Sequence, residues 1–218
     1  AVKPAHSAPA PEPGPADPVR ERRERLEAEF AKREAHARRM GGPEKLARRE
    51  AAGLLNARQR IDRPFDPGSF IESGLFATSA NPPDRERSPG DGKIAGFGKV
   101  DGRETAAVSN DFTVLGAASG ATNGRKIAHM RRVAGQRGMP LVFLGESSGA
   151  RMPDHMGSRG MGSLLGNDGA QYQRLRETHW ASATLGPSYG SAAWDAVLSD
   201  FSGRRNGAVH AASTSLPA

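Results

Sequence analysis

The sequence contains no cysteine, and its apolar runs are short. Without cysteine, its 218 residues exclude disulfide bridges and cysteine-ligated zinc or iron–sulfur sites. The apolar run at residues 139–144 falls far short of the roughly 20 residues that a membrane-spanning helix needs. No charged and then apolar leader opens the chain. These features predict a soluble, cytoplasmic protein with no membrane partner.

Positive charge is concentrated in one segment. The net charge is +7, and residues 18–63 hold 14 basic against 8 acidic residues, which leaves the remainder nearly neutral. The basic residues of this segment are interleaved with glutamate, and Phe30 is its one aromatic residue. Nucleic-acid grooves combine basic side chains with several stacked aromatic rings. We therefore expect a solvated helical surface and no nucleic-acid partner.

The first 68 residues predict a tail followed by a helical arm. Residues 1–17 are mostly alanine and proline, a composition typical of a disordered tail. Asp17 and Pro18 offer a cap and a first-turn proline for a helix that ends before Gly41-Gly42-Pro43. A second helix is predicted over residues 44–60. Together these helices form an arm over residues 18–68.

The composition changes at residue 69, where an α/β domain is predicted to run to residue 201. Asp101-Gly102-Arg103 joins two short runs, at 93–100 and 104–109, and Asp-Gly in this position predicts a β-hairpin. The segments expected to follow are a strand at 111–115, a helix at 125–136, a buried strand at 141–144, a glycine-rich loop at 145–169, a helix at about 170–180 and a strand at 181–185. Repeated strand, loop and helix units imply an α/β fold. Residues 202–218 are polar and predict an irregular tail.

Two glycine-rich turns follow strands that we expect to be neighbours. One turn is at residues 148–151 and the other at residues 188–192. A glycine-rich turn that opens a helix leaves backbone N–H groups without partners, and such groups can stabilise an oxyanion. The pair of turns therefore favours chemistry through a thioester enolate.

The same segment supports a second interpretation. Residues 145–149 match the G-x-S-x-G pattern of a nucleophile elbow, with Ser147 as the nucleophile of a serine hydrolase. Asp195 or Asp200, followed by His210, would supply the acid and the base. A tight glycine turn after a buried strand explains the pattern more simply. Histidine pairs spaced for metal binding are absent, so no metal site is expected.

Several short motifs occur in a fixed order between about residues 45 and 201. They are residues 57–63 with 66–70, Gly90-Asp91-Gly92, residues 110–116, Lys126-Ile127, residues 147–151 and residues 186–201. In order and spacing they resemble the carboxyltransferase (β) subunit of biotin-dependent acyl-CoA carboxylases. That family includes the propionyl-CoA, acetyl-CoA and methylcrotonyl-CoA carboxylases.

The resemblance implies a crotonase-like fold of repeated ββα units. Family chains hold two such domains, and this chain resembles an incomplete amino-terminal one. In the family, acyl-CoA binds to this domain, and biotin arrives on a partner carrier protein charged by biotin carboxylase. The resemblance thus implies carboxyl transfer to the α-carbon of an acyl-CoA, with other carboxyltransferase chains as further partners.

The resemblance also assigns site residues. The catalytic backbone donors expected for the thioester are those of Gly149, Ala150, Gly190 and Ser191. The residues expected to face coenzyme A are Gly116, Ala117, Ala118, Ser119 and Lys126, with Lys126 offering its charge to the phosphates. Three residues depart from the family pattern, because Ser148 and Ser191 stand where glycine is usual and Asp195 where a small neutral residue is usual.

These departures leave other functions open. The chain is expected to be inactive without partner chains. It could instead be a non-catalytic or truncated assembly subunit that binds its neighbours through the helical arm. A biotin-dependent acyl-CoA decarboxylase subunit would use the same site in the opposite direction.

Overall fold

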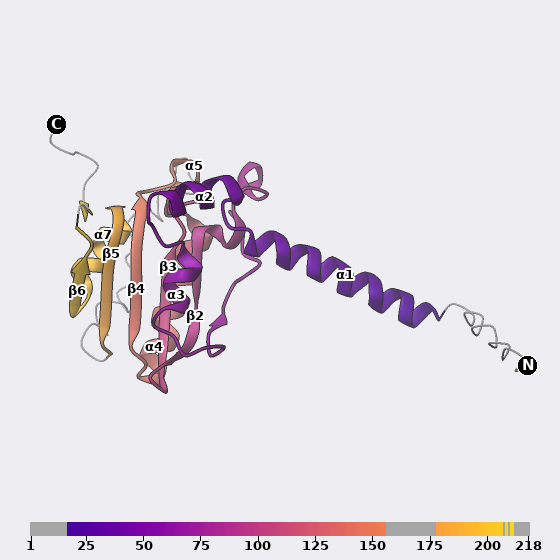
Figure 1. Cartoon of the computed structure of the whole chain (residues 1–218), viewed down its shortest axis with the longest axis horizontal. Coiled ribbons are helices and arrows are strands. Elements are labelled where there is room, and N and C mark those ends of the chain that lie inside the picture. The colour runs from indigo at the N-terminus through magenta and orange to yellow at the C-terminus, as the bar shows by residue number, and fades with distance from the viewer. Residues whose placement is uncertain (1–16, 156–177, 207, 209, 212–218) are drawn as a thin grey trace, which may run out of the picture. The chain divides into compact units, whose positions relative to one another are not determined.

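The computed structural model describes residues 17–155, 178–206, 208 and 210–211 (Figure 1). The chain divides into two units, at residues 1–33 and 34–218. Helix α1 (Pro18–Arg38) begins as predicted, because the Asp17 carboxylate accepts a hydrogen bond from the Val19 N–H at 3.0 Å. Ion pairs one turn apart, such as Glu29 with Arg33, line its surface. Within the described ranges, no helix combines the length and apolar character needed to cross a bilayer.

The predicted helix over residues 44–60 is wrong, because two helices occupy this stretch. They are α2 (Pro43–Ala51) and α3 (Ala57–Asp62). Gly53 has a φ of +66°, which ends the first helix. The Asn56 side chain then accepts the N–H groups of Arg58 and Gln59, and the Gln59 side chain accepts the Asn56 N–H. This capping box starts a new helix.

The centre of the larger unit is a mixed seven-stranded sheet. Its strands are β1 (Ile71–Glu72), β2 (Lys93–Val100), β3 (Arg103–Asn110), β4 (Leu141–Ser148), β5 (Trp180–Tyr189), β6 (Phe201–Arg204) and β7 (His210–Ala211). The order is β1-β2-β3-β4-β5-β6, with β7 also paired to β5. The first three strands are antiparallel, and the pairs from β3 onward are parallel.

The predicted hairpin is confirmed. Strands β2 and β3 pair with Val100 opposite Arg103, which leaves Asp101 and Gly102 as a two-residue turn. Both turn residues have positive φ, +49° and +75°. This conformation explains the Asp-Gly sequence, since these residue types tolerate the left-handed region.

The sheet carries helices on both faces, and its side chains alternate between two cores. On one face, α4 (Ala121–Arg137) packs Ile127, Met130 and Ala134 against the apolar side chains of β2, β3 and β4. On the other face, α3 packs Ala57 and Ile61 against the opposite side chains of the sheet. Figure 1 shows α3 in front of the strands and α4 passing behind them. The predicted arm over residues 18–68 is therefore wrong for α3, because α3 forms part of one hydrophobic core of the domain.

Two further expectations differ from the structure, and two others fall almost entirely outside the described residues. Residues 112–114 form a turn and Leu115–Ala117 the 3-10 helix η3, not a strand, because the Asp111 carboxylate accepts the Thr113 N–H and hydroxyl. The irregular tail predicted at 202–218 contains strand residues at 202–204 and 210–211, because these residues pair with β5. The helix expected at about 170–180 lies outside the described residues except at its end, where Trp180 begins β5, and the tail expected at 1–17 lies outside them except for Asp17.

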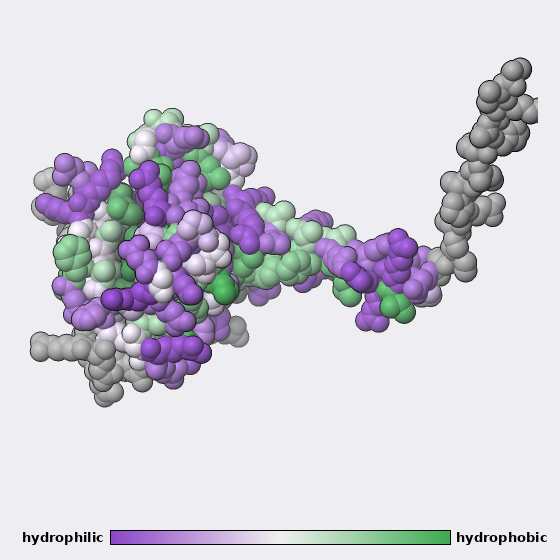
Figure 2. Space-filling model, turned by 60° about the horizontal axis from the view of Figure 1, so that its bottom comes forward, coloured by the Kyte–Doolittle hydropathy of each residue, from purple (hydrophilic) through white to green (hydrophobic). Residues whose placement is uncertain are grey.

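Short helices complete the structure. They are η1 (Pro82–Asp84), η2 (Pro89–Gly92), α5 (Met152–His155) and α7 (Ser191–Leu198). Helix α7 follows β5 and contacts both β5 and β4. Hydrophilic residues cover most of the face seen in Figure 2, with apolar residues in separate patches.

Candidate functional site

Two glycines meet where β4 and β5 end. The strands are parallel neighbours, with Ser148 opposite Tyr189, so the turns that follow them lie side by side as predicted. Gly149 has a φ of +101° and Gly190 a φ of +63°. A Cβ on Gly190 would lie 3.7 Å from the Gly149 Cα. We call this close approach of Gly149 and Gly190 the glycine seam.

The backbone next to the seam is oriented by a short pairing with Ser119. The Ser119 N–H donates to the Gly149 carbonyl at 2.7 Å, and the Arg151 N–H donates to the Ser119 carbonyl at 2.7 Å. In such a parallel bridge the N–H of the residue between them, Ala150, faces the opposite side. That side is the one on which β5 ends. The Ala150 N–H is thus directed toward the seam.

The other predicted donors differ in their availability. The Gly149 N–H donates to the Ser147 hydroxyl at 3.1 Å, so it is already engaged inside the protein. Gly190 caps α7, and the N–H groups of Ser191 and the residues after it begin that helix. The first N–H groups of a helix have no partner within it and lie at the positive end of its dipole. Ala150, Gly190 and Ser191 therefore fit an oxyanion better than Gly149 does.

Two serine hydroxyls bridge the loop after β3 to the first residue of α7. The Ser119 and Ser191 Oγ atoms are 2.5 Å apart. Ser191 is exposed and Ser119 half-buried. This hydroxyl pair, Ser119 with Ser191, lies beside the glycine seam.

The predicted coenzyme A loop is strained and closely held. Leu115, Gly116 and Ala117 have φ values of +48°, +62° and +49°. A Cβ on Gly116 would lie 2.5 Å from the Ser148 hydroxyl, so only glycine fits there. The N–H groups of Ala117 and Ala118 donate to carbonyls within the loop, at 2.8 and 3.1 Å. They are therefore not free to bind phosphate.

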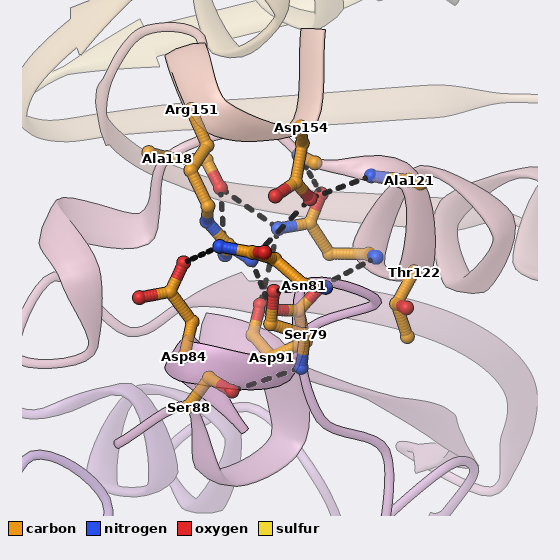
Figure 3. A network of polar contacts seen from close by, with 12 residues as sticks. Ser79, Asn81, Asp84, Ser88, Asp91, Ala118, Ala121, Thr122, Arg151 and Asp154 are labelled. Carbon is orange, nitrogen blue, oxygen red and sulfur yellow. Dashed lines mark hydrogen bonds and ion pairs between the residues drawn. The ribbon is translucent and has the colours of Figure 1, made fainter. Parts of the chain in front are cut away.

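A buried polar network holds the Ala118 carbonyl of this loop in place. Arg151 donates to the Asp91 carboxylate at 2.6 Å and to the Ala118 carbonyl at 3.2 Å. Asn123 donates to the same Ala118 carbonyl at 2.8 Å, and its backbone N–H donates to Asp91 at 2.9 Å. Figure 3 shows Arg151 and Asp154 entering this network from the side opposite Asp91. Burial raises the pKa of Asp91, and the Arg151 guanidinium opposes that rise.

The predicted role of Lys126 is wrong. Its ammonium points into the protein and donates to the carbonyls of Gly74, Gly90 and Lys93, at 3.1, 2.9 and 2.6 Å. These three bonds use all three of its donors. Burial lowers its pKa to about 8. Lys126 therefore stabilises the backbone of the site and has no donor left for a phosphate.

A second buried lysine lies below the same loop. Lys93 is 1% exposed, and its ammonium donates to the Ala117 carbonyl at 2.9 Å. Burial lowers its pKa to about 8, while Asp195 and Asp91 oppose that fall. Lys93 was not predicted as a site residue, because a lysine at the start of a strand usually reaches solvent.

Ser147 does not act as an exposed nucleophile. It is fully buried, donates its hydroxyl to the Ala117 carbonyl at 3.1 Å and accepts the Gly149 N–H. Its oxygen thus joins two turns of the site and is closed to a substrate. The serine hydrolase alternative is wrong for this reason.

The residue before Ser147 joins the helices to the sheet. The buried Glu146 carboxylate accepts two hydrogen bonds from Arg49, at 3.0 and 2.8 Å, and one from Arg60 at 2.6 Å. A Cβ on Gly186 would lie 2.6 Å from this carboxylate, so Gly186 makes room for it. We call Glu146, Arg49 and Arg60 the carboxylate clamp. Its arginines are more than 80 residues from Glu146 in sequence, and no local pattern signals it.

Asp195, the unusual residue of α7, is also buried and paired. Its carboxylate forms an ion pair with Arg131 of α4, whose guanidinium lies over the rings of Phe143 and Trp180 at 5.5 and 5.3 Å. Burial raises the pKa of Asp195, and Arg131 opposes that rise. A small cavity between α7 and the sheet is lined by Asp195, Asn110 and Thr184 among others. The pair joins α7 to α4.

The described part of the chain places no group of three or more histidine, aspartate or glutamate side chains where they could hold a metal ion. His155 instead contacts the Ser119 carbonyl through Nε2 at 3.0 Å. The donors around the seam are neutral N–H and O–H groups, a set that suits a ligand oxygen.

Similar proteins define the class and the family of this fold. A solved structure of transcarboxylase 12S with hydrolysed methylmalonyl-coenzyme A bound matches with a TM-score of 0.76 and 28% identity, over 91% of this chain and 38% of that one. The fold is accordingly the crotonase-like α/β fold of carboxyltransferases. Residues 48–210 match the carboxyl transferase domain, and this chain belongs to that family.

Individual relatives include both carboxylases and decarboxylases. The propionyl-CoA carboxylase carboxyltransferase subunit of Haloferax mediterranei is 33% identical over 180 residues, which cover 79% of this chain and 34% of that protein. The methylmalonyl-CoA decarboxylase subunit alpha of Propionigenium modestum is 33% identical over 165 residues, covering 74% and 31%. The chain thus spans about a third of the length of the curated relatives it matches.

Proposed function

We propose that this chain is the acyl-CoA side of a biotin-dependent carboxyltransferase. The observation that carries the proposal is the glycine seam at the ends of β4 and β5, in a chain of the carboxyl transferase domain family. Backbone N–H groups at this point can stabilise negative charge on a thioester oxygen as an enolate forms.

The chain's own residues have three tasks in this proposal. Ala150, Gly190 and Ser191 direct N–H groups to the thioester oxygen. The network of Arg151, Asn123 and Asp91 holds the neighbouring loop carbonyls in place, so that the donors need no reorganisation during the reaction. The surfaces of Gly116 and Ser119, and not the Lys126 ammonium, would then border the bound coenzyme A.

The remaining chemistry requires a partner. Carboxybiotin on a carrier protein would supply the carboxyl group and accept the α-proton of the acyl thioester. We therefore expect turnover only in an assembly with a biotin carrier, a biotin carboxylase and further carboxyltransferase chains.

Decarboxylation is the second candidate, favoured by the similarity to a methylmalonyl-CoA decarboxylase subunit. Both directions pass through the same enolate, so the seam serves either. The partner that charges or discharges biotin would determine the direction.

Binding of acyl-CoA tests the proposal. We expect propionyl-CoA to bind the full chain in calorimetric titration, and Gly190→Ala to reduce that binding, because the φ of +63° at Gly190 strains any residue with a Cβ. Gly203→Ala is the matched control, since Gly203 lies on β6 with open space around its Cα and no positive φ. Equal binding of propionyl-CoA by Gly190→Ala and wild type would show that the glycine seam is not part of the binding site.

Assembly is tested separately. Native protein captured on monomeric avidin should contain this chain in a fixed ratio with a biotinylated subunit, as intact-mass analysis would show. Failure to co-elute with any biotinylated protein, in a preparation that binds propionyl-CoA, would leave the chain as a binding or assembly subunit without turnover.

A further inference from the structure

The hydroxyl pair has one hydrogen to spare. Ser119 and Ser191 carry one O–H each, and their 2.5 Å contact uses one of the two hydrogens as a donor. The second hydrogen remains for a third acceptor. Since a hydroxyl that accepts a hydrogen bond becomes a stronger donor itself, the pair offers one polarised O–H beside the seam.

Both members of the pair are held where they are. The Ser119 backbone is fixed on either side, by the bond from its N–H to Gly149 and by the bonds that its carbonyl accepts from Arg151 and His155. Ser191 is the first residue of α7 and follows Gly190, whose left-handed φ sets its direction. The hydroxyls can therefore rotate but cannot leave the seam.

The environment of the pair favours an anion. Ser191 is the first residue of α7, so its hydroxyl lies at the positive end of that helix. An exposed Ser191 hydroxyl is accessible to a ligand. A carboxylate accepts more than one hydrogen bond at each oxygen, which an alkyl substituent cannot do.

We propose that the Ser119–Ser191 hydroxyl pair recognises a carboxylate on the α-carbon of an acyl-CoA, and so makes this site selective for a carboxylated thioester over the same thioester without that group. This inference rests on the function proposed above and names the ligand class of that site. Ser119 and Ser191 act as specificity-determining residues, and the pair breaks no covalent bond.

The test compares two ligands that differ by one carboxylate. Methylmalonyl-CoA and propionyl-CoA are titrated into the full 218-residue chain and into Ser119→Ala, Ser191→Ala and the double variant. We expect wild type to prefer methylmalonyl-CoA, and the double variant to reduce that preference about 10-fold, because the hydroxyl donor to a charged group is then lost. Either single variant keeps one O–H and should lose less of the preference than the double variant, because the remaining hydroxyl is no longer polarised by its partner.

Two further variants separate recognition from folding. Ser191→Thr keeps the hydroxyl and should keep the preference. Ser202→Ala breaks a similar hydroxyl contact, Ser182 with Ser202 at 3.1 Å, between β5 and β6 and should leave it unchanged. Circular dichroism checks that each variant is folded.

The outcomes distinguish this inference from the proposed function. An unchanged ligand preference in the double variant, with both thioesters still bound, would overturn the role of the hydroxyl pair and leave the site standing. If folded wild type binds neither thioester, the proposed function fails, and the inference fails with it.

Discussion

Backbone strain at the candidate site is concentrated in Leu115, Gly116 and Ala117. Each has a φ near +50° to +60°, and the first and third are not glycine. Such residues persist only where the surroundings determine them. Here the Ala117 carbonyl is fixed by Lys93 and Ser147, so buried donors maintain the conformation.

Gly116→Ala should destabilise the protein by about 1–3 kcal/mol. The new methyl group would clash with Ser148, and the positive φ at this position strains any residue other than glycine. Urea unfolding followed by circular dichroism measures the change. Gly124→Ala is the matched control. Gly124 lies in α4 with nothing near its Cα, so alanine should raise stability by about 0.5–1 kcal/mol. A neutral Gly116→Ala would mean that the loop relaxes freely.

The two glycine turns could be predicted from the sequence, but the direction of the Lys126 side chain could not. Glycine directly after a strand is a local signal, and it identified Gly149 and Gly190 correctly as neighbours. The direction of Lys126 depends on carbonyls of Gly74, Gly90 and Lys93, which reach it from 33 to 52 residues away. A local sequence pattern gives no information on carbonyl groups that come from such distant parts of the chain.

The carboxylate clamp determines how helices α2 and α3 attach to the sheet. Arg49 comes from α2 and Arg60 from α3, and both meet Glu146 of β4. Its members are at most 10% exposed. In such a buried cluster, removal of one charge leaves the partners uncompensated.

Glu146→Gln should therefore lower the free energy of unfolding by about 3–5 kcal/mol, although glutamine has the same shape. Denaturant unfolding measures it. Glu44→Gln serves as the control, because the Glu44–Arg48 pair is exposed and should have little effect. A Glu146→Gln variant as stable as wild type would show that the clamp contributes no net stability.

Some helices and strands could be predicted from the sequence and others could not. The β2–β3 hairpin follows from its Asp-Gly turn, because both partners are adjacent in the chain. The break between α2 and α3 was missed, although Gly53 and the capping pair of Asn56 and Gln59 mark it in the sequence. Strands β6 and β7 were missed because pairing with β5, and not their own composition, makes them strands.

The molecule as a whole buries charge of both signs beneath the site. Lys93 and Lys126 have a pKa of about 8 in the folded protein, against 10.5 as the ordinary value. Below pH 8, both states hold the proton, and the folded state bears the full penalty of a buried cation. Between pH 8 and 10.5, the folded state releases protons that the unfolded state keeps.

The contribution of these lysines to stability should therefore rise with pH across this window, by up to about 1.4 kcal/mol per pH unit for each lysine. Unfolding free energies measured between pH 7.5 and 10 should show a smaller rise in Lys126→Met than in wild type. Lys99→Met, which removes an exposed lysine of β2, is the control for charge alone. Equal slopes in Lys126→Met and wild type would contradict the prediction.

The spatial order of the sheet repeats the order of the chain from β1 to β6. Each strand that leaves a ribosome can thus add to an edge that already exists. The hairpin of β2 and β3 forms from adjacent residues, whereas β4 and β5 can pair only after the crossover segment before each of them has been synthesised. Growth of the sheet can proceed in one direction during synthesis, and the glycine seam, formed by the turns after β4 and β5, is among the later features to assemble.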